Sequence, residues 1–188
     1  MSSIVISGDT SGAITLAAPS VAGTNTATLP AATGTVMVSG NMPAFSAYAN
    51  ANQSFASATY TLTQLQVKEF DTASCFNNTN ATVGGIPAYA FLPNVAGYYQ
   101  VTACLNFGAA AGTVAIVSFY KNGSEFKRSS QIPMTSAANI QVAGTALIYL
   151  NGTTDYIQFY AYQGSVGALS TSSGANQVYF QAVMVRAA

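Results

Sequence analysis

The segment YYQVTACLNF, residues 98–107, shows most directly what kind of fold this chain adopts. Successive side chains of a β-strand point to opposite sides of the sheet, so apolar residues at every second position predict a strand with one face in a core. In this segment the alternating positions are Tyr99, Val101, Ala103, Leu105 and Phe107.

Five further segments have the same β-branched and aromatic texture, and clusters of Gly, Asn, Pro and Ser separate them. Asn122-Gly123 and Asn151-Gly152 are typical of tight turns between antiparallel strands. Helical periodicity is nearly missing. The pattern predicts an all-β fold, a sandwich or jelly roll. The five segments are 57–65, 114–120, 140–150, 156–162 and 177–185.

Charge is scarce along the chain. Only 5% of its 188 residues are charged, against about 25% in a typical soluble domain. Five basic residues balance five acidic ones, and there is no His and no Trp. The missing His excludes Ser-His-Asp and Cys-His nucleophile systems and imidazole-dependent metal sites. Zero net charge argues against a nucleic-acid binder. We therefore expect a binding or structural protein without cofactor or metal.

The long uncharged stretch from Thr10 to Val67 does not predict a membrane span. Polar residues, Gly and Pro interrupt it every few positions, whereas a spanning helix needs about 20 apolar residues in a row. The first residues lack the basic and apolar segments of a secretory signal, so we expect folding in a cytoplasm without disulfides. Whether Cys75 and Cys104 pair stays open, because sequence does not give the distance between them.

The first 41 residues differ from the rest. No aromatic residue occurs from Ile4 to Val38, so this stretch cannot bury enough apolar area to offset the entropy lost on ordering. It must order against identical neighbours or against another protein. We place a boundary near Asn41, which gives an extended β-arm at 1–41 and a head at 42–188. The nearly uncharged surface also favours association.

Six short motifs follow one another from Pro43 onward: PAFSA at 43–47, FD at 70–71, FLP with AGYYQV at 91–101, YKNG at 120–123, LIYLNGTTDYI at 147–157 and FQAVMV at 180–185. In this order they resemble the globular head of complement component 1q and the related tumour-necrosis-factor-like jelly rolls. The resemblance implies a ten-stranded jelly roll that assembles as a tight homotrimer. Two departures are Ala182, where a Gly is common, and the absence of a collagen-like stalk.

The arm has a resemblance of its own. GDTSG at 8–12, ITLAAP at 14–19 and TLPAATGTV at 28–36 resemble N-terminal segments of bacteriophage fibre and head-surface proteins. The resemblance implies a structural protein on the virion surface, docked through its arm to the major capsid protein or another virion protein. The residues expected to dock are Ile4, Ile6, Ile14, Leu16, Leu29, Val36 and Val38.

Two groups of residues are candidate contacts of the head. Tyrosines crowd two neighbouring predicted strands and either line the trimer contact or bind sugar; we favour the trimer contact. Three of the five cations surround one hairpin, where they either keep its tip soluble or touch a partner or an anionic glycan. The tyrosines are Tyr149, Tyr156, Tyr160 and Tyr162, and the cations are Lys121, Lys127 and Arg128.

Glu69 and Asp71 are the only candidate catalytic pair. On a regular strand their spacing puts both carboxylates on one face, about 6–7 Å apart, a separation used in glycoside cleavage. A solvated strand end is the favoured interpretation, so we expect no enzyme. The preferred hypothesis is a capsid decoration or cement protein or head fibre. A tail-fibre tip that recognises host glycan is the alternative, and a small glycan-cleaving enzyme is the remote one.

Overall fold

The computed structural model describes residues 3–28, 31, 33–34, 36–134 and 138–188. Contacts within the chain divide it into two compact units, Met1–Gly34 and Thr35–Ala188. The sequence analysis divides the chain by expected role instead, into an attachment arm at 1–41 and a head at 42–188. This division stays a prediction. The second unit is called the sandwich below.

The first unit holds one antiparallel hairpin of β1 (Ser3–Ser7) and β2 (Ala13–Ala17). Its turn is closed by the backbone N–H of Gly8, which donates to the carbonyl of Gly12 at 3.0 Å. Opposed residues of antiparallel strands point to the same face. The hairpin therefore has one aliphatic face, in which Ile4 opposes Leu16 and Ile6 opposes Ile14.

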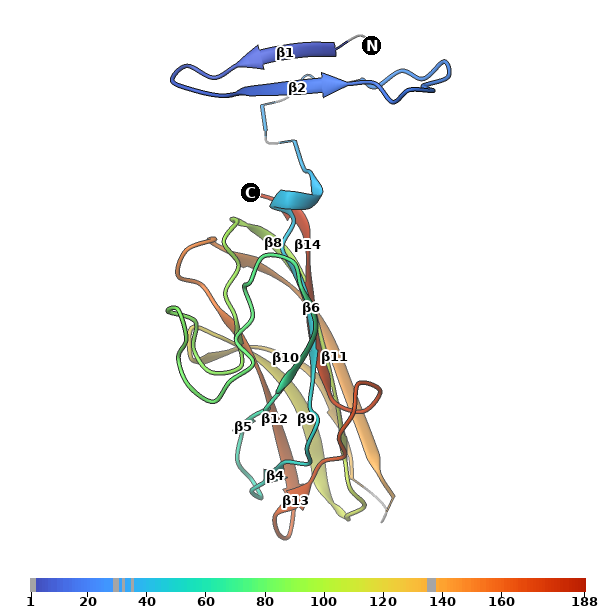
Figure 1. Cartoon of the computed structure of the whole chain (residues 1–188). Helices are drawn as coiled ribbons and strands as arrows, with labels where there is room; N and C mark the ends of the chain where they lie inside the picture. Colours follow the sequence, from blue (N-terminus) through green and yellow to red (C-terminus); the bar gives the residue numbers. More distant parts are fainter. Residues whose placement is uncertain (1–2, 29–30, 32, 35, 135–137) are drawn as a thin grey trace. The chain divides into compact units, whose positions relative to one another are not determined.

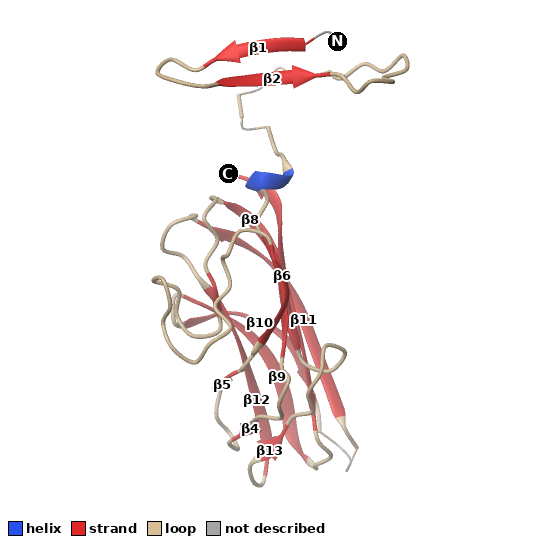
Figure 2. Ribbon diagram, viewed as in Figure 1, coloured by secondary structure: helices blue, strands red, loops and turns tan. Residues whose placement is uncertain are grey.

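The sandwich consists of two antiparallel sheets (Figures 1 and 2). We call them the β8 sheet and the β12 sheet after their central strands. The β8 sheet has the order β11 (Ile140–Leu150), β8 (Gly97–Phe107), β14 (Tyr179–Ala187), β3 (Ala44–Tyr48) and β6 (Val67–Asp71). The β12 sheet has the order β10 (Ser124–Ile132), β9 (Gly112–Lys121), β12 (Ile157–Ser165) and β5 (Thr61–Leu62), with β7 (Ala90–Phe91) also paired to β12.

Two short elements complete the sandwich. β4 (Ser54–Phe55) pairs with β13 (Leu169–Ser170), and a 3-10 helix, η1 (Ser39–Asn41), precedes β3. This helix and the C-terminus lie at the same end of the sandwich (Figure 1). The all-β jelly-roll prediction is confirmed. Among the described residues, no helix has the length and apolar character needed to cross a membrane.

The alternation in β8 is confirmed residue by residue. Tyr99, Val101, Ala103, Leu105 and Phe107 are all 0% exposed and point between the sheets. The predicted strands at 114–120, 140–150, 156–162 and 177–185 correspond to β9, β11, β12 and β14. The alternation of side chains along the sequence was sufficient to predict these strands, because each of them has one face against the core.

Stacked phenylalanines fill the core. The Phe45 ring stacks on Phe76 at 4.4 Å and on Phe91 at 4.7 Å between centroids, and meets the edge of Phe180 at 5.0 Å. Phe180 also approaches Phe159 of the facing sheet at 6.1 Å. Full burial of one such ring stabilises the fold by roughly 1.5–3 kcal/mol, so these aromatics contribute to holding the two sheets together.

Two local predictions need correction. The predicted strand at 57–65 is wrong over most of its length, because only Thr61–Leu62 pair in β5 and Ala58 adopts a left-handed φ of 54° in a turn. Asn151-Gly152 does form a turn, but it links β11 to β12, which belong to different sheets. Asn122-Gly123, by contrast, closes the β9–β10 hairpin with φ values of 53° and 81°.

Candidate interaction surfaces

The solvent face of the β8 sheet, called the β8 face below, presents large apolar side chains. Tyr98 and Tyr149 lie opposite each other on β8 and β11, with ring centroids 5.5 Å apart. Leu147 is 55% exposed and Val183 is 46% exposed. Phe70 and Val185 add to the same exposed set. The described segments of the sandwich leave these side chains open to solvent.

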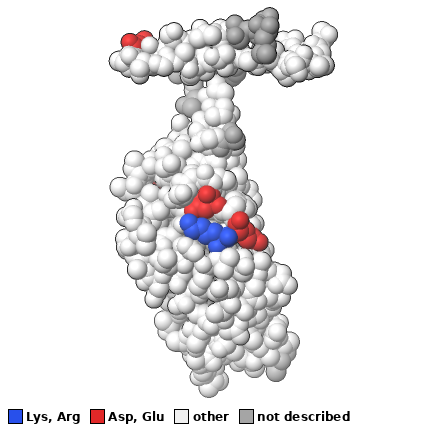
Figure 3. Space-filling view, in the orientation of Figure 1, with Lys and Arg blue, Asp and Glu red and all other residues white. Residues whose placement is uncertain are grey.

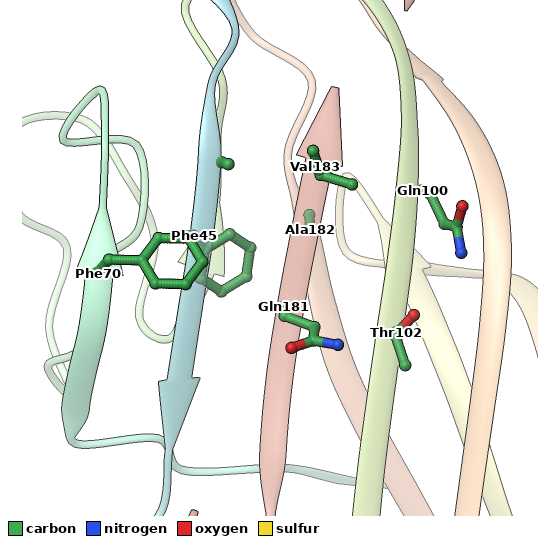
Figure 4. A pocket seen from close by; sticks show the side chains of 8 residues that line it. Phe45, Phe70, Gln100, Thr102, Gln181, Ala182 and Val183 are labelled. Atoms are coloured by element: carbon green, nitrogen blue, oxygen red, sulfur yellow. The ribbon is translucent and has the colours of Figure 1, made fainter. Parts of the chain in front are cut away.

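A hollow of about 310 Å³ lies in the β8 face. Figure 4 shows the Phe70 ring reaching from β6 over β3, with Gln181 and Val183 on β14 and Gln100 and Thr102 on β8. The hollow thus combines an aromatic wall with side-chain amides. This mixture suits a protein partner, because contacts between proteins commonly join apolar area to scattered hydrogen bonds.

Charge in the five strands of this sheet is confined to β6 and to Arg186 near the end of β14. On the side of the sandwich seen in Figure 3, the charged atoms gather in one place, over β6. Lys68 and Asp71 form an ion pair there at 2.9 Å. Apart from β6 and Arg186, which lies opposite Tyr98 in the register of β14 and β8, the strands of this face carry no charge that a partner would have to bury.

The two carboxylates of the candidate catalytic pair have separate structural partners. Asp71 accepts hydrogen bonds from the backbone N–H groups of Cys75 and Phe76, at 2.9 and 3.1 Å, besides its ion pair. Glu69 accepts a hydrogen bond from the Ser46 hydroxyl at 2.6 Å. The β3–β6 pairing shifts register between Ser46 and the next residue, so the regular alternation expected for 69–71 does not apply.

The solvent face of the β12 sheet carries a cluster of tyrosines. Tyr120 of β9 stacks on Tyr160 of β12 with centroids 3.9 Å apart and an interplanar angle of 22°. Tyr60, which precedes β5, lies 5.2 Å from Tyr162 and 6.0 Å from Tyr120. All four rings are partly exposed. We call Tyr60, Tyr120, Tyr160 and Tyr162 the tyrosine cluster; the sequence did not point to Tyr60 or Tyr120.

A pair of opposite charges borders this cluster. Arg128 donates to both carboxylate oxygens of Glu125, at 3.0 and 3.1 Å, and its guanidinium lies 5.6 Å from the Tyr60 ring centroid. The hydrogen bond from Arg128 holds the pKa of Glu125 below its ordinary value. Burial, together with the Glu125 charge, raises the pKa of Tyr60. The cluster therefore sets partly exposed aromatic rings beside a compact ion pair.

The three predicted contact cations differ in their partners within the chain. Lys121 pairs with Asp155 at 2.8 Å and donates to the backbone carbonyl of Tyr149 at 2.8 Å. Arg128 is paired with Glu125 as described. Among the described residues Lys127 takes part in no ion pair. Two of the three cations are thus engaged within the chain.

The structure also separates the four predicted trimer-contact tyrosines. Tyr149 lies on the β8 face, whereas Tyr160 and Tyr162 belong to the tyrosine cluster on the β12 sheet. Tyr156 lies beside the β9–β10 turn, where its hydroxyl comes close to Gly123. The four tyrosines therefore lie on more than one surface of the chain, and their role in a trimer contact stays a prediction.

The predicted docking residues fall into both units. Ile4, Ile6, Ile14 and Leu16 form the aliphatic face of the hairpin and are 56–67% exposed. Val36 and Val38 belong to the second unit and are exposed. Leu29 lies outside the described residues.

Both cysteines, Cys75 and Cys104, are buried and free. Burial raises the pKa of each thiol. The question left open by the sequence is thereby answered: these two side chains do not form a disulfide.

Comparison with known proteins places the sandwich in a fold class. No family model matches the chain, and neither does any curated protein sequence. Among solved structures, murine APRIL at pH 5.0 aligns with a TM-score of 0.54 at 11% identity, over 77% of this chain and 99% of the other. The globular domain of zebrafish complement 1qA gives a TM-score of 0.51 at 12% identity, over 78% and 99%. The PRD1 vertex protein P5 gives 0.53 at 16% identity, over 77% and 97%.

The sandwich therefore has the complement 1q/tumour-necrosis-factor-like jelly-roll fold. Proteins of this fold are typically trimeric, and the similar structures belong to non-enzymatic proteins. One of them is a phage vertex protein. At these identities the likeness concerns the fold.

Proposed function

We propose that this chain is a non-enzymatic structural protein of a bacteriophage particle. Three sandwiches associate through the β8 face, and the N-terminal hairpin docks on another virion protein. The observation that carries the proposal is the β8 face itself, a broad apolar surface that the described residues of one chain leave uncovered.

Association through the β8 face removes exposed apolar area from water. A half-exposed Leu or Val gains about 1 kcal/mol when it is fully covered, and a three-fold assembly repeats each gain three times. Leu147, Val183 and Val185 are three such side chains, and the partly exposed ring of Tyr149 adds to the same area. The trimers typical of this fold support three copies as the assembly.

Light scattering of the purified protein tests the assembly. We expect a mass three times the 19.3 kDa of the chain. Val183→Glu places a charge in the contact, so it should give folded monomers. Val166→Glu is the matched control, because Val166 is fully exposed outside this face. A wild-type monomer at micromolar concentration would refute the trimer.

The hairpin of the first unit supports the docking role. A two-stranded hairpin is marginally stable by itself, and every described side chain of β1 and β2 is exposed. Its aliphatic face is therefore a surface that needs a partner. We propose the major capsid protein or another virion protein as that partner.

Two observations support a place on a phage particle. The arm motifs resemble segments of phage fibre and head-surface proteins, and the PRD1 vertex protein P5 shares the fold of the sandwich. Capsid decoration or a head fibre is the preferred role, and a tail-fibre tip is the alternative.

Binding to particles that lack this protein tests the docking role. The full chain should bind, whereas a chain without residues 1–41 should stay trimeric and fail to bind. Ile6→Asp should also abolish binding. Val5→Asp, on the opposite face of the hairpin, is the matched control. Particle binding by the truncated chain would contradict the proposal.

The non-enzymatic assignment has its own test. Asp71 is held by Lys68 and two backbone amides, so it is not free to act together with Glu69 on a sugar. Incubation with capsular polysaccharide should therefore release no reducing ends. Release that disappears in Glu69→Gln would establish an enzyme instead.

A further inference from the structure

We propose that the tyrosine cluster on the β12 sheet is a binding site for an uncharged glycan. The site is built from segments far apart in the sequence: Tyr60 before β5, Tyr120 on β9, and Tyr160 and Tyr162 on β12. It goes beyond the structural role proposed above and assigns the sandwich a ligand.

The choice of side chains on the two sides of β12 points to a ligand. Toward the core the strand presents Phe159 and Ala161, which are 0% exposed. Toward solvent it presents Tyr160 and Tyr162, partly exposed and packed against other tyrosines. Phenylalanine would cover the sheet as well by packing alone. Rings that also carry hydroxyls suit a ligand with both apolar and hydroxyl-bearing surfaces.

A sugar ring has that combination. Its C–H groups form an apolar face that can lie on an aromatic ring, and its hydroxyls need donors and acceptors at the rim. Arg128 and Glu125 supply both kinds of group beside the Tyr60 ring. The guanidinium has five N–H donors, so Arg128 keeps three for sugar hydroxyls beyond the two that bind Glu125.

The charge of the site favours an uncharged ligand over an anionic one. Arg128 and Glu125 form a bidentate pair, so their charges cancel at the edge of the cluster. Lys121, at the end of β9, is held by Asp155. Lys127 alone remains as an unpaired cation of the hairpin within the described residues. An acidic polysaccharide would find little net positive charge here.

The site also lies on the correct side of the molecule for a large ligand. It belongs to the sheet opposite the β8 face. If three chains associate through the β8 face, a step that rests on the proposed function, each tyrosine cluster faces outward. Three equivalent sites on one particle would then bind a repeating polymer with higher avidity than one site does.

The test is an array of purified bacterial surface polysaccharides, neutral and acidic, probed with the labelled full-length protein. We expect binding to at least one neutral polysaccharide. Tyr162→Ala should weaken that binding at least tenfold, and Tyr162→Phe should weaken it less, because the ring is kept. Arg128→Gln should also weaken it at least tenfold. Lys127→Gln, which removes an exposed cation of the same hairpin opposite the core residue Phe119, is the matched control and should bind like wild type.

Circular dichroism and light scattering of each variant show that its fold and assembly are retained. Binding to no polysaccharide, binding to acidic polysaccharides alone, or binding that Tyr162→Ala and Arg128→Gln leave unchanged would each overturn the proposal. The readout is independent of the trimer and docking tests. A protein that is monomeric, or that binds no particle, can still bind glycan through this cluster.

Discussion

The Nζ atom of Lys121 lies 2.8 Å from the Oδ2 atom of Asp155, where the end of β9 meets the loop that follows β11. Both side chains are largely buried, with 18% and 13% of their surface exposed. Asn122 donates a further hydrogen bond to Asp155 at 2.8 Å, and the backbone N–H of Asn151 donates at 3.1 Å. The pair thus ties a strand of the β12 sheet to a connection from the β8 sheet.

This pair predicts a loss of stability in acid. Partial burial acts to raise the pKa of Asp155, but the hydrogen bond and charge of Lys121 and the bond from Asn122 lower it overall. A lowered folded-state pKa means that the carboxylate stabilises the fold above its ordinary value of 3.8. That stabilisation is lost as the pH falls through the folded-state value.

Asp155→Asn tests the acid prediction. Breaking a largely buried pair should lower the free energy of unfolding by about 2–4 kcal/mol at pH 7. The difference from wild type should shrink as the pH falls below 3.8. Urea titrations at several pH values and one fixed protein concentration measure it. A difference that stays constant down to pH 2.5 would contradict the assignment.

Phe45→Ala should be among the most destabilising single substitutions. The Phe45 ring is fully buried and contacts Phe76, Phe91 and Phe180. Its removal leaves a cavity between the sheets and should cost about 3–5 kcal/mol. Val166→Ala, at a fully exposed position, should change the free energy of unfolding by less than about 0.5 kcal/mol. Equal effects in denaturant titrations would show that the stacked rings are not central to the core.

Gly152→Ala should destabilise the β11–β12 connection. Gly152 has a φ of 74°, and a Cβ atom there would lie 2.4 Å from the backbone nitrogen of Ala96. The left-handed conformation and the close backbone contact should together cost at least about 1–3 kcal/mol. Gly167→Ala is the control, because a Cβ at that site meets no atom within 4 Å. Thermal unfolding of the two variants distinguishes these outcomes.

The two thiols should react slowly with Ellman's reagent in the folded protein. Cys75 and Cys104 are buried, and burial raises the pKa of both, so little thiolate is exposed to the reagent. Two thiols per chain should titrate quickly in 6 M guanidinium chloride without a reducing agent. Fewer than two would reveal a disulfide and contradict the free state of these residues.

The local sequence was sufficient to predict which segments form strands and which face of a strand is buried. Alternation alone identified the buried face of β8 and separated Phe159 and Ala161 from the tyrosines of β12. It also located the β9–β10 turn, because an Asn-Gly pair readily adopts positive φ at both positions. These features depend on neighbours in the chain, and the sequence contains that information directly.

Which side chains lie together on the solvent faces of the two sheets depended on the pairing of strands that are distant in the sequence. β11 and β12 are consecutive in the chain but lie in different sheets, so Tyr149 and Tyr160 face opposite sides although both belong to aromatic strands. Tyr60 meets Tyr120 and Tyr162 only because β5 and β9 pair with β12. No local pattern encodes such pairings, since they follow from the long-range closure of the sandwich.

The sequence by itself determined that this chain forms strands with one buried face, carries almost no charge and begins with a segment free of aromatic residues from Ile4 to Val38. Only the tertiary structure decided which side chains share a surface. It engaged Lys121 and Arg128 in ion pairs, gathered four tyrosines on the β12 sheet and left an apolar face on the β8 sheet. The physical reason is that periodicity sets the direction of a side chain along its own strand, whereas sheet order sets its neighbours.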